Sequence, residues 1–258
     1  MVMDTIEKLP IQRITTEGKQ DTQDTVTAEQ PLTIVLNNRE LVTLLCSPSD
    51  LEYLAIGFLA AEELIKSKNE VKQITINDRH DTVYVETAGK QEPPARQFVR
   101  SSSSGISFAG AADARELTKI KSRTVISTPQ IFHLVKEFQH RSQIYRATGG
   151  VHGAALCDTS GILLFSEDIG RHNTLDKILG ECIWKDITAK DRIMITSGRI
   201  SSEILLKAAR QGIPILISKS APTNLGVKLG NDLDMTVIGF ARGERMNVYS
   251  GGWRVNNF

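Results

Sequence analysis

The sequence is poor in aromatic residues and cysteines, and it has no long hydrophobic run. Of its 258 residues, 5% are aromatic and three are cysteines. The longest apolar run, at 54–61, is far shorter than the roughly 20 residues that span a bilayer. The first residues also lack the apolar core of a secretory signal. We therefore expect no membrane segment and a cytoplasmic protein.

The three cysteines, Cys46, Cys157 and Cys182, are odd in number and far apart in the sequence. This pattern favours reduced thiols over a disulfide framework or a zinc cluster. Each cysteine falls in a predicted strand or on the apolar face of a predicted helix. We expect all three thiols to be buried and inert.

An excess of charge of either sign is missing as well. The chain has 31 basic and 30 acidic residues, and its net charge of +1 gives no general attraction for nucleic acid or an anionic membrane. No G-x-G-x-x-G motif follows a predicted strand, which argues against a dinucleotide-dependent oxidoreductase. Without His-x-Glu and Pro-Cys-x-x-Cys motifs, a zinc nucleoside deaminase is excluded, and we expect no zinc and no other metal ligands.

Composition divides the N-terminal half of the chain into three parts. Residues 1–28 are polar and lack helical or strand periodicity, which predicts a flexible N-terminal arm. Residues 29–88 indicate a small α+β unit with a hairpin on each side of a helix, which begins at the capping-box sequence 49–52 and runs to about residue 66. Residues 89–127 are rich in Ser, Gly and Pro and predict a loop or linker. The predicted strands of the α+β unit are 31–36, 41–46, 71–76 and 82–86.

Residues 128–258 predict an α/β domain. It begins with a helix that has Thr128 as its N-cap, and strands and helices alternate from residue 150 onward. Such alternation is typical of a mostly parallel sheet that is covered by helices on both faces. The predicted strands are 153–157, 162–165, 192–196, 215–217 and 235–240, and the predicted helices are 173–184, 201–211 and a short one near 224.

Similar polar residues follow three of these strands. Arg199, Lys219 and Arg242 each lie beside Gly or Ser directly after a strand. In such sheets ligands bind beyond the carboxyl ends of the strands, and two of these loops lead into helices whose first N–H groups favour an anion. The alternative is that the Ser and Thr residues cap helices and the basic side chains are solvated. Three loops at one edge favour a site for phosphate or pyrophosphate.

Two histidines, His152 and His172, lie next to these segments, beside glycines and beside Arg171 respectively. Either could act as an acid or base, but neither has a neighbouring nucleophile in the sequence. We therefore favour hydrogen bonding to a ligand. Glu167 and Asp168 near Arg171 indicate an ion-pair scaffold that holds this loop.

Several segments together resemble the FdhD/NarQ family of formate dehydrogenase accessory proteins. Residues 30–66 are similar to the N-terminal part of that family, and the resemblance covers essentially the whole chain after residue 28. The remaining segments that carry it are Thr148–Ala155, Glu167–Lys177, Ser197–Ala208, Gly212–Thr223 and Gly239–Ser250.

The resemblance implies a sulfurtransferase of molybdenum or tungsten cofactor maturation. Such a protein accepts sulfur as a persulfide from a cysteine desulfurase and passes it to the bis-molybdopterin guanine dinucleotide cofactor of the formate dehydrogenase catalytic subunit. It also implies a cytidine-deaminase-like fold for the C-terminal domain, and we expect a homodimer. The cofactor, with its GDP-like moiety, would be bound by the family's contact segment and by the strand-end residues. These are Phe240, Ala241, Arg242, Gly243, Glu244, Arg245, Arg199, Lys219, His152 and His172.

One departure from the family affects its chemistry. The family carries a Cys-x-x-Cys pair in the loop after the N-terminal unit, and this chain has Ser104 and Ser107 at those positions. A thiolate attacks a persulfide and retains its terminal sulfur, whereas a serine hydroxyl forms no such intermediate. Two interpretations remain open: the cysteines were replaced by engineering, or the protein is a cofactor-binding chaperone without sulfur transfer.

Overall fold

The computed structural model describes residues 5–89 and 118–257. The predicted carrier positions Ser104 and Ser107 therefore lie outside the described residues, and so does most of the predicted 89–127 loop. None of the described helices is long and apolar enough to cross a membrane.

The N-terminal unit is a four-stranded sheet with one helix against it. The strands lie in the order β4-β3-β6-β5, with β3 and β6 parallel and the other two pairs antiparallel. Helix α1 (Leu51–Ala61) buries nine of its eleven residues, because its apolar side chains pack on the sheet and on a second helix. The strands are β3 (Gln30–Leu36), β4 (Arg39–Cys46), β5 (Val71–Ile76) and β6 (Thr82–Thr87), and a 3₁₀ turn, η1 (Lys68–Glu70), precedes β5.

Both predicted hairpins are confirmed, but the start and the end of α1 differ from the prediction. Its N-cap is Asp50, which has a left-handed backbone and makes no side-chain capping bond, so the predicted capping box is absent. The helix ends at Ala61, about five residues earlier than predicted, and Glu63 adopts a positive φ of 60° just beyond it. A capping-box spacing alone does not ensure a capping box, since the bonds also require an extended N-cap backbone.

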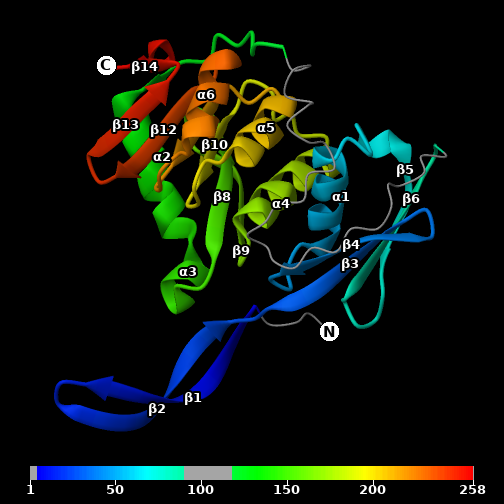
Figure 1. The fold of residues 1–258 in the computed structure, drawn as a ribbon, viewed down its shortest axis with the longest axis vertical. Coiled ribbons are helices and arrows are strands. Elements are labelled where there is room, and N and C mark those ends of the chain that lie inside the picture. The colour runs from blue at the N-terminus through cyan, green and yellow to red at the C-terminus, as the bar shows by residue number, and fades with distance from the viewer. Residues whose placement is uncertain (1–4, 90–117, 258) are drawn as a thin grey trace.

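The C-terminal domain is built on a six-stranded sheet in the order β13-β12-β11-β10-β8-β9 (Figure 1). Helix α2 covers one face, where its Ile131, Leu134, Val135 and Phe138 pack on side chains of β8, β10 and β11. Helices α4 and α5 cover the other face. The strands are β8 (His152–Cys157), β9 (Ile162–Asp168), β10 (Ile193–Thr196), β11 (Ile215–Ser218), β12 (Thr236–Arg242) and β13 (Arg245–Ser250). The helices are α2 (Thr128–Arg141), α3 (Gln143–Thr148), α4 (Arg171–Trp184), α5 (Ser202–Arg210) and α6 (Asn224–Asp232).

The sheet is mixed, so the prediction of a mostly parallel sheet is wrong, whereas helices on both faces are confirmed. Only β10–β11 and β11–β12 pair in parallel; β8 is antiparallel to both β9 and β10, and β13 is antiparallel to β12. The reason lies in the connections. Short turns join β8 to β9 and β12 to β13, and a turn of that length returns the chain antiparallel. Helices link β9, β10, β11 and β12 in turn, and these four strands run in one direction; β8 lies between β9 and β10 and runs opposite to both.

Helices α1 and α4 join the two sheets by a close crossing, and they lie side by side in Figure 1. A Cβ atom added to Gly57 of α1 would collide with the backbone of Asp176, and one added to Gly180 of α4 would collide with the backbone of Tyr53. Glycine at both positions therefore lets the two helix backbones come together.

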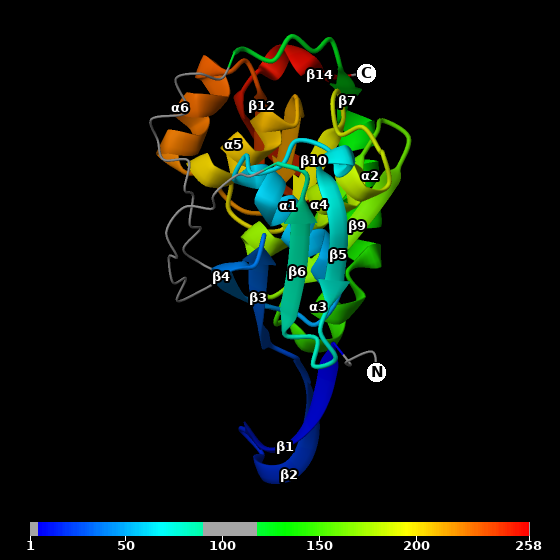
Figure 2. The same ribbon diagram turned by 90° about the vertical axis from the view of Figure 1, so that its right-hand side faces the viewer.

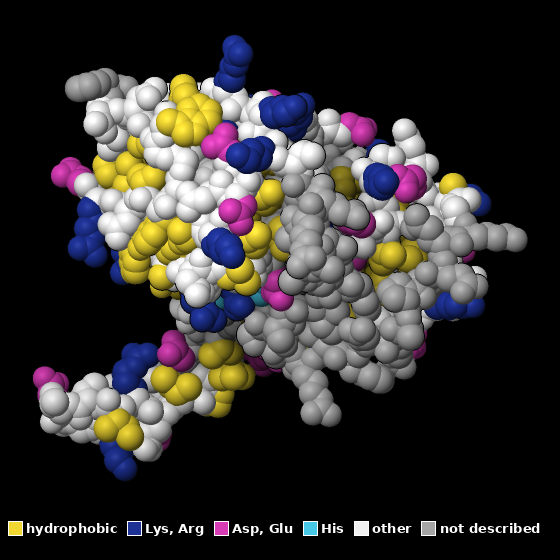
Figure 3. Space-filling view, turned by 45° about the horizontal axis from the view of Figure 1, so that its top comes forward, with side chains coloured by type: hydrophobic (Ala, Val, Ile, Leu, Met, Phe, Trp, Pro, Cys, Tyr) yellow, Lys and Arg dark blue, Asp and Glu magenta, His cyan; other side chains and the backbone are white. Residues whose placement is uncertain are grey.

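Residues 6–27 form a two-stranded antiparallel hairpin, which contradicts the predicted absence of regular structure at 1–28. Strands β1 (Ile6–Thr15) and β2 (Gly18–Thr27) pair along their full length and project away from the rest of the molecule (Figure 1, Figure 2). Most of the hairpin is exposed, including the apolar side chains of Ile6, Leu9 and Ile14, and hydrophobic atoms are visible along it in Figure 3. The prediction failed because backbone pairing forms this hairpin without a buried face to impose periodicity.

The remaining short elements were not predicted, and one predicted cap is displaced by a residue. Ser127 caps α2 and forms a capping box with Gln130, so Thr128 is the first helical residue and not the N-cap. Strand β7 (Ile126–Ser127) pairs in parallel with β14 (Val255–Asn256), which follows the 3₁₀ turn η3 (Gly252–Arg254). These contacts tie the chain end to the start of α2.

Candidate functional site

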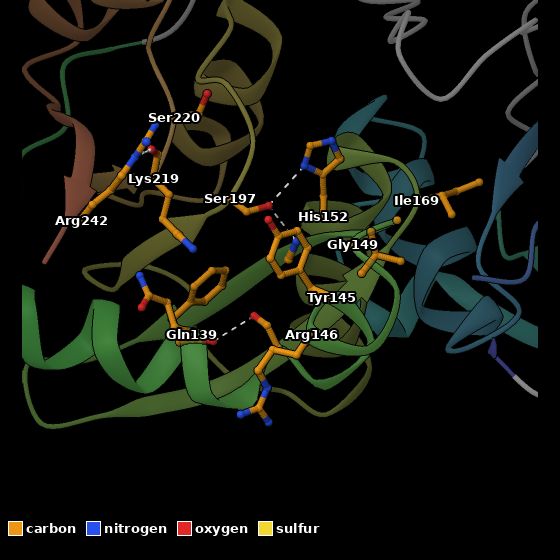
Figure 4. Close-up of a pocket in the computed structure, with 15 residues that line it drawn as sticks. Gln139, Tyr145, Arg146, Gly149, His152, Ile169, Ser197, Lys219, Ser220 and Arg242 are labelled. Atoms are coloured by element: carbon orange, nitrogen blue, oxygen red, sulfur yellow. Dashed lines mark hydrogen bonds between the residues drawn. The ribbon is translucent and has the colours of Figure 1, made fainter. Parts of the chain in front are cut away.

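A pocket of about 730 Å³ opens at one edge of the six-stranded sheet. It lies where β10, β11 and β12 end and where β8 begins, because β8 runs in the opposite direction to β10. Helices α2 and α3 form its opposite wall (Figure 4). The side chains used below are Gln139, Tyr145, His152, Ser197, Lys219 and Arg242.

Two cations lie on the β11–β12 side of this pocket. The Nε of Arg242 donates a hydrogen bond of 3.0 Å to the Lys219 carbonyl oxygen, which holds the two residues together. The Lys219 ammonium lies 5.8 Å from the ring centre of Tyr145 on the opposite wall. Burial, and then the nearby Arg242 guanidinium, lower the pKa of Lys219. The partly buried Lys219 ammonium and the exposed Arg242 guanidinium together favour an anionic ligand in this pocket.

His152 and Ser197 form a hydrogen-bonded pair on the other side of the pocket (Figure 4). His152 Nδ1 lies 3.2 Å from Ser197 Oγ, and the same oxygen accepts the Gly153 N–H at 3.0 Å. Burial is the main cause that lowers the pKa of His152, followed by the charges of Arg171 and His172. The imidazole is therefore neutral near pH 7 and serves as a hydrogen-bonding group in the pocket wall.

Of the three basic residues that follow the strands, the structure brings two into one pocket. Lys219 and Arg242 line the pocket, whereas the exposed Arg199 lies outside its lining. His172 is also outside: it is buried, with Nε2 3.1 Å from Glu203 Oε2, and this hydrogen bond is the main cause that lowers the pKa of Glu203. His172 thus links the first turns of α4 and α5.

Of the predicted contact segment 240–245, only Arg242 lines the pocket. Strand β12 continues to Arg242, two residues beyond the predicted strand end, and Gly243 and Glu244 form the turn into β13. Phe240 has a left-handed backbone with φ 53°, and its ring lies 5.8 Å from the Arg242 guanidinium carbon. Ala241 is buried and Arg245 is exposed.

The alternative prediction, that Ser and Thr residues after the strands cap helices, is confirmed at two positions. Ser201 Oγ accepts the Ile204 N–H at the start of α5, and Thr223 Oγ1 accepts the Gly226 N–H at the start of α6. These hydroxyl groups stabilise helix ends, and they do not line the pocket. Positive charge in the pocket therefore comes from the basic side chains in its lining, Arg146, Lys219 and Arg242, and the two capped helix ends do not supply it.

Helix α3 contributes pocket residues that the sequence analysis missed. Tyr145 and Arg146 lie on it, and Gln139 comes from the preceding helix. The Glu167 carboxylate accepts the backbone N–H groups of residues 144 and 145, at 3.1 and 2.9 Å, which anchors the start of α3. A helix of six residues is too short for a periodic pattern. Its one signal is Gly149, a left-handed C-cap directly after the last helical residue.

Asp168 forms a buried ion pair with Lys177. The sequence analysis predicted instead an ion-pair scaffold of Glu167 and Asp168 with Arg171. Lys177 Nζ lies 2.7 Å from Asp168 Oδ2, and both side chains are almost completely buried. Asp168 also accepts the Ser47 N–H from the N-terminal unit, and Asn173 Nδ2 donates both to Asp168 and to the Leu45 carbonyl oxygen. This network joins the two sheets and lies outside the pocket.

The described residues contain three free, buried thiols and no group of three or more His, Cys, Asp or Glu side chains that could hold a metal ion. Burial raises the pKa of Cys46 and of Cys182 to about 12, and it raises the pKa of Cys157 as well. A thiol with such a pKa carries almost no thiolate near neutral pH and is a poor nucleophile.

Residues 27–256 match the model of the FdhD/NarQ family. Three curated relatives carry the description "Sulfur carrier protein FdhD". Those of Bacillus pumilus (strain SAFR-032) and Bacillus subtilis (strain 168) are 42% identical over 237 and 238 residues, and that of Staphylococcus aureus (strain MRSA252) is 41% identical over 240 residues. These alignments cover 90–91% of this chain and 90–91% of the relatives.

A crystal structure from Desulfotalea psychrophila, of a protein described as a formate dehydrogenase accessory protein, has a similar fold. It superimposes with a TM-score of 0.83 at 27% identity and covers 98% of this chain and 100% of its own. The family model spans both sheets and the pocket residues, and the curated relatives are similar over nearly the whole chain. The chain therefore belongs to the FdhD/NarQ family.

Proposed function

We propose that this protein binds a guanine-nucleotide arm of the bis-molybdopterin guanine dinucleotide cofactor during the maturation of formate dehydrogenase. The observation that carries the proposal is the pair of cations Lys219 and Arg242, held together in one wall of the strand-end pocket. Charge-assisted hydrogen bonds from such groups are the usual protein contacts of a pyrophosphate.

The residues of the pocket fit such a group. Its volume of about 730 Å³ is within the usual range for small-molecule sites, roughly 300–1,000 Å³. Lys219 and Arg242 would hold the phosphates, and the Tyr145 ring offers a flat surface on which a purine base can stack. His152, neutral and held by Ser197, adds a hydrogen-bonding group beside them. When bound, the cofactor would supply the metal centre that accepts sulfur.

The sulfur-carrier name of the relatives supports a transfer function. For this transfer we propose a cysteine desulfurase as the donor and the cofactor of the formate dehydrogenase catalytic subunit as the acceptor. The finer expectations of a homodimer and of a cytidine-deaminase-like fold belong to the same proposal. Ser104 and Ser107 favour the second candidate function, a chaperone that delivers the cofactor without handling sulfur. Both candidates require the same nucleotide-binding pocket.

Titration with GDP tests the proposal. Arg242→Ala removes one pocket cation, and we expect its affinity to fall by about tenfold or more, the typical effect of losing a charge-assisted hydrogen bond. Arg79→Ala is the control, because Arg79 is an exposed arginine in the turn between β5 and β6 and lies outside the pocket lining. Its affinity should change less than about twofold. Undetectable GDP binding by the unmodified protein, or equal affinity of both variants, would refute the proposal.

A further inference from the structure

Strand pairing fixes the position of the Ser197 hydroxyl beside His152. His152 is the first residue of β8, and Ser197 directly follows β10, which pairs with β8. Two reciprocal hydrogen bonds join these strand ends: the Ser197 N–H donates to the Gly153 carbonyl oxygen at 2.9 Å, and the Gly153 N–H donates to Ser197 Oγ at 3.0 Å. The serine side chain is therefore held by the backbone of the residue that follows the histidine.

The hydrogen bonds of this hydroxyl decide which nitrogen of His152 carries the proton. A backbone N–H always donates, so Ser197 Oγ accepts from Gly153, and its own proton needs an acceptor. Within residues 5–89 and 118–257, the only acceptor bonded to Oγ is His152 Nδ1, at 3.2 Å. Nδ1 therefore accepts the serine proton, and a neutral imidazole that accepts at Nδ1 carries its own proton on Nε2.

The second nitrogen of the ring is available to a ligand. His152 lines the pocket, and Figure 4 shows one ring nitrogen turned toward Ser197 and the other turned away from it. In the described part of the chain Nε2 has no hydrogen-bond partner, and it is not shielded from water. As the proton is on this atom, Nε2 can donate to an oxygen of a ligand and cannot accept from a ligand N–H.

The two pocket cations lie on the other side of Ser197 from His152 (Figure 4). A phosphate held by Lys219 and Arg242 thus leaves the Nε2–H of His152 without an acceptor. An unpaired donor next to a bound anion favours a ligand that brings a second anionic oxygen to it. A diphosphate that passes over Ser197 supplies that oxygen, whereas a monophosphate is too short to engage both sides.

We propose that His152 donates from Nε2 to the second phosphate of a nucleoside diphosphate, that Ser197 is the residue which positions this donor, and that the pocket thereby selects diphosphates over monophosphates. The inference rests on the proposed function, because it assigns the first phosphate to Lys219 and Arg242. His152 is a binding residue in this account, and Ser197 acts through it.

Two nucleotides and four variants test the inference. GDP and GMP differ by the second phosphate alone, and calorimetry gives the affinity of each. His152→Ala removes the donor, Ser197→Ala removes its support, and Ser197→Thr keeps the hydroxyl. Ser160→Ala is the control, because Ser160 is exposed in the turn between β8 and β9 and lies outside the pocket lining. Thermal unfolding shows which variants are folded. Nitrogen NMR of the histidine rings shows the protonated atom, and the signals that His152→Ala removes are those of His152.

We expect His152→Ala and Ser197→Ala to weaken GDP binding by about tenfold and GMP binding by less than about twofold. Ser197→Thr and Ser160→Ala should bind both nucleotides within about twofold of the unmodified protein. In the unmodified protein without ligand, the NMR signals should show Nε2 protonated and Nδ1 as a hydrogen-bond acceptor, and Ser197→Ala should shift the Nδ1 signal.

Three results would each overturn the inference: a proton on Nδ1 of His152 in the unmodified protein, an equal loss of GDP and GMP affinity in His152→Ala, or unchanged GDP affinity in Ser197→Ala. The proposed function survives all three, since GDP would still bind at Lys219 and Arg242. If the unmodified protein binds neither nucleotide, the proposed function fails and the inference fails with it.

Discussion

Lys177 Nζ lies 2.7 Å from Asp168 Oδ2 in the interior between the two sheets, where both side chains are shielded from water. The lysine also donates to the Ser47 carbonyl oxygen and to Ser49 Oγ, both from the N-terminal unit. The segment Glu167–Lys177 is one of those that resemble the FdhD/NarQ family, and in this structure its Asp168, Asn173 and Lys177 side chains bind the N-terminal unit.

Removing one partner of this ion pair should destabilise the protein strongly. Asp168→Asn leaves the Lys177 ammonium buried without a carboxylate, and we expect a loss of about 3–5 kcal/mol in the free energy of unfolding. Urea denaturation measures it. Lys177→Met should cost less, because Asp168 keeps the N–H groups of Ser47 and Gly170 as donors. The control is Lys185→Met at the exposed C-cap of the same helix, where losing the ion pair with Glu181 should cost less than about 1 kcal/mol. A similar midpoint for Asp168→Asn and the control would contradict this account.

His152 should make stability depend on pH below neutrality. Its pKa is lowered in the folded state, so the unfolded chain, with a histidine pKa of about 6.5, takes up a proton first as the pH falls. The contribution of His152 is therefore present above that pH and is lost as the pH falls through the folded-state pKa. Unfolding free energies at pH 5 and pH 8 should differ less in His152→Asn than in the unmodified protein. The exposed His133→Asn variant should keep the full difference, and equal pH dependence of all three proteins would count against the prediction.

The three cysteines should not react in the folded protein. Cys46, Cys157 and Cys182 are buried with raised pKa values, so both access and thiolate are lacking. Ellman's reagent at pH 8 should detect no fast-reacting thiol in the native state and three thiols per chain in guanidinium. A thiol that reacts within seconds in the native protein would show that one of these cysteines is accessible.

Restoring the family's cysteines should restore sulfur acceptance. Ser104→Cys with Ser107→Cys provides a thiol pair at the family's carrier positions, whereas the unmodified chain has only its three buried cysteines. After incubation with a cysteine desulfurase and cysteine, the double variant should gain the mass of one sulfur atom. Reduction by dithiothreitol, which should remove that mass, is the control. Equal gain by the serine form would assign the carrier role to a buried cysteine.

Much of the fold could be predicted because burial leaves a pattern in the sequence. Strands such as 193–196 and 215–218 are buried on both faces and contain continuous apolar runs, and helices α4 and α5 bury apolar residues at helical spacing. The direction of β8 could not be inferred from such a pattern, since a buried strand has the same composition whether its neighbour is parallel or antiparallel. The hairpin at 6–27 was missed for the opposite reason, because it has almost no buried residue.

The candidate site was predictable only in part. Lys219 and Arg242 follow neighbouring parallel strands, and strand direction places such residues together. Arg199 follows β10, which neighbours β11 in the sheet, but its side chain lies outside the pocket. The order of strands and loops in the sequence does not indicate whether a side chain after a strand points into the pocket or away from it. Tyr145 and Gln139 lie on helices of the opposite wall, far in sequence from Lys219 and Arg242, so only the tertiary structure reveals that they share one pocket.

The antiparallel pairing of β8 with β10 has a consequence for ligand recognition. Ala154 lies opposite Thr196 in the ladder, and its neighbours alternate between the two faces of the sheet: Leu156 packs towards α4 and α5, whereas Cys157 packs towards α2. A slip of one residue would exchange these faces and turn His152 away from Ser197. The apolar side chains at the Cys157 end of β8, which lie far from the pocket, therefore fix the register of the strand. That register in turn determines whether the His152 imidazole faces Ser197.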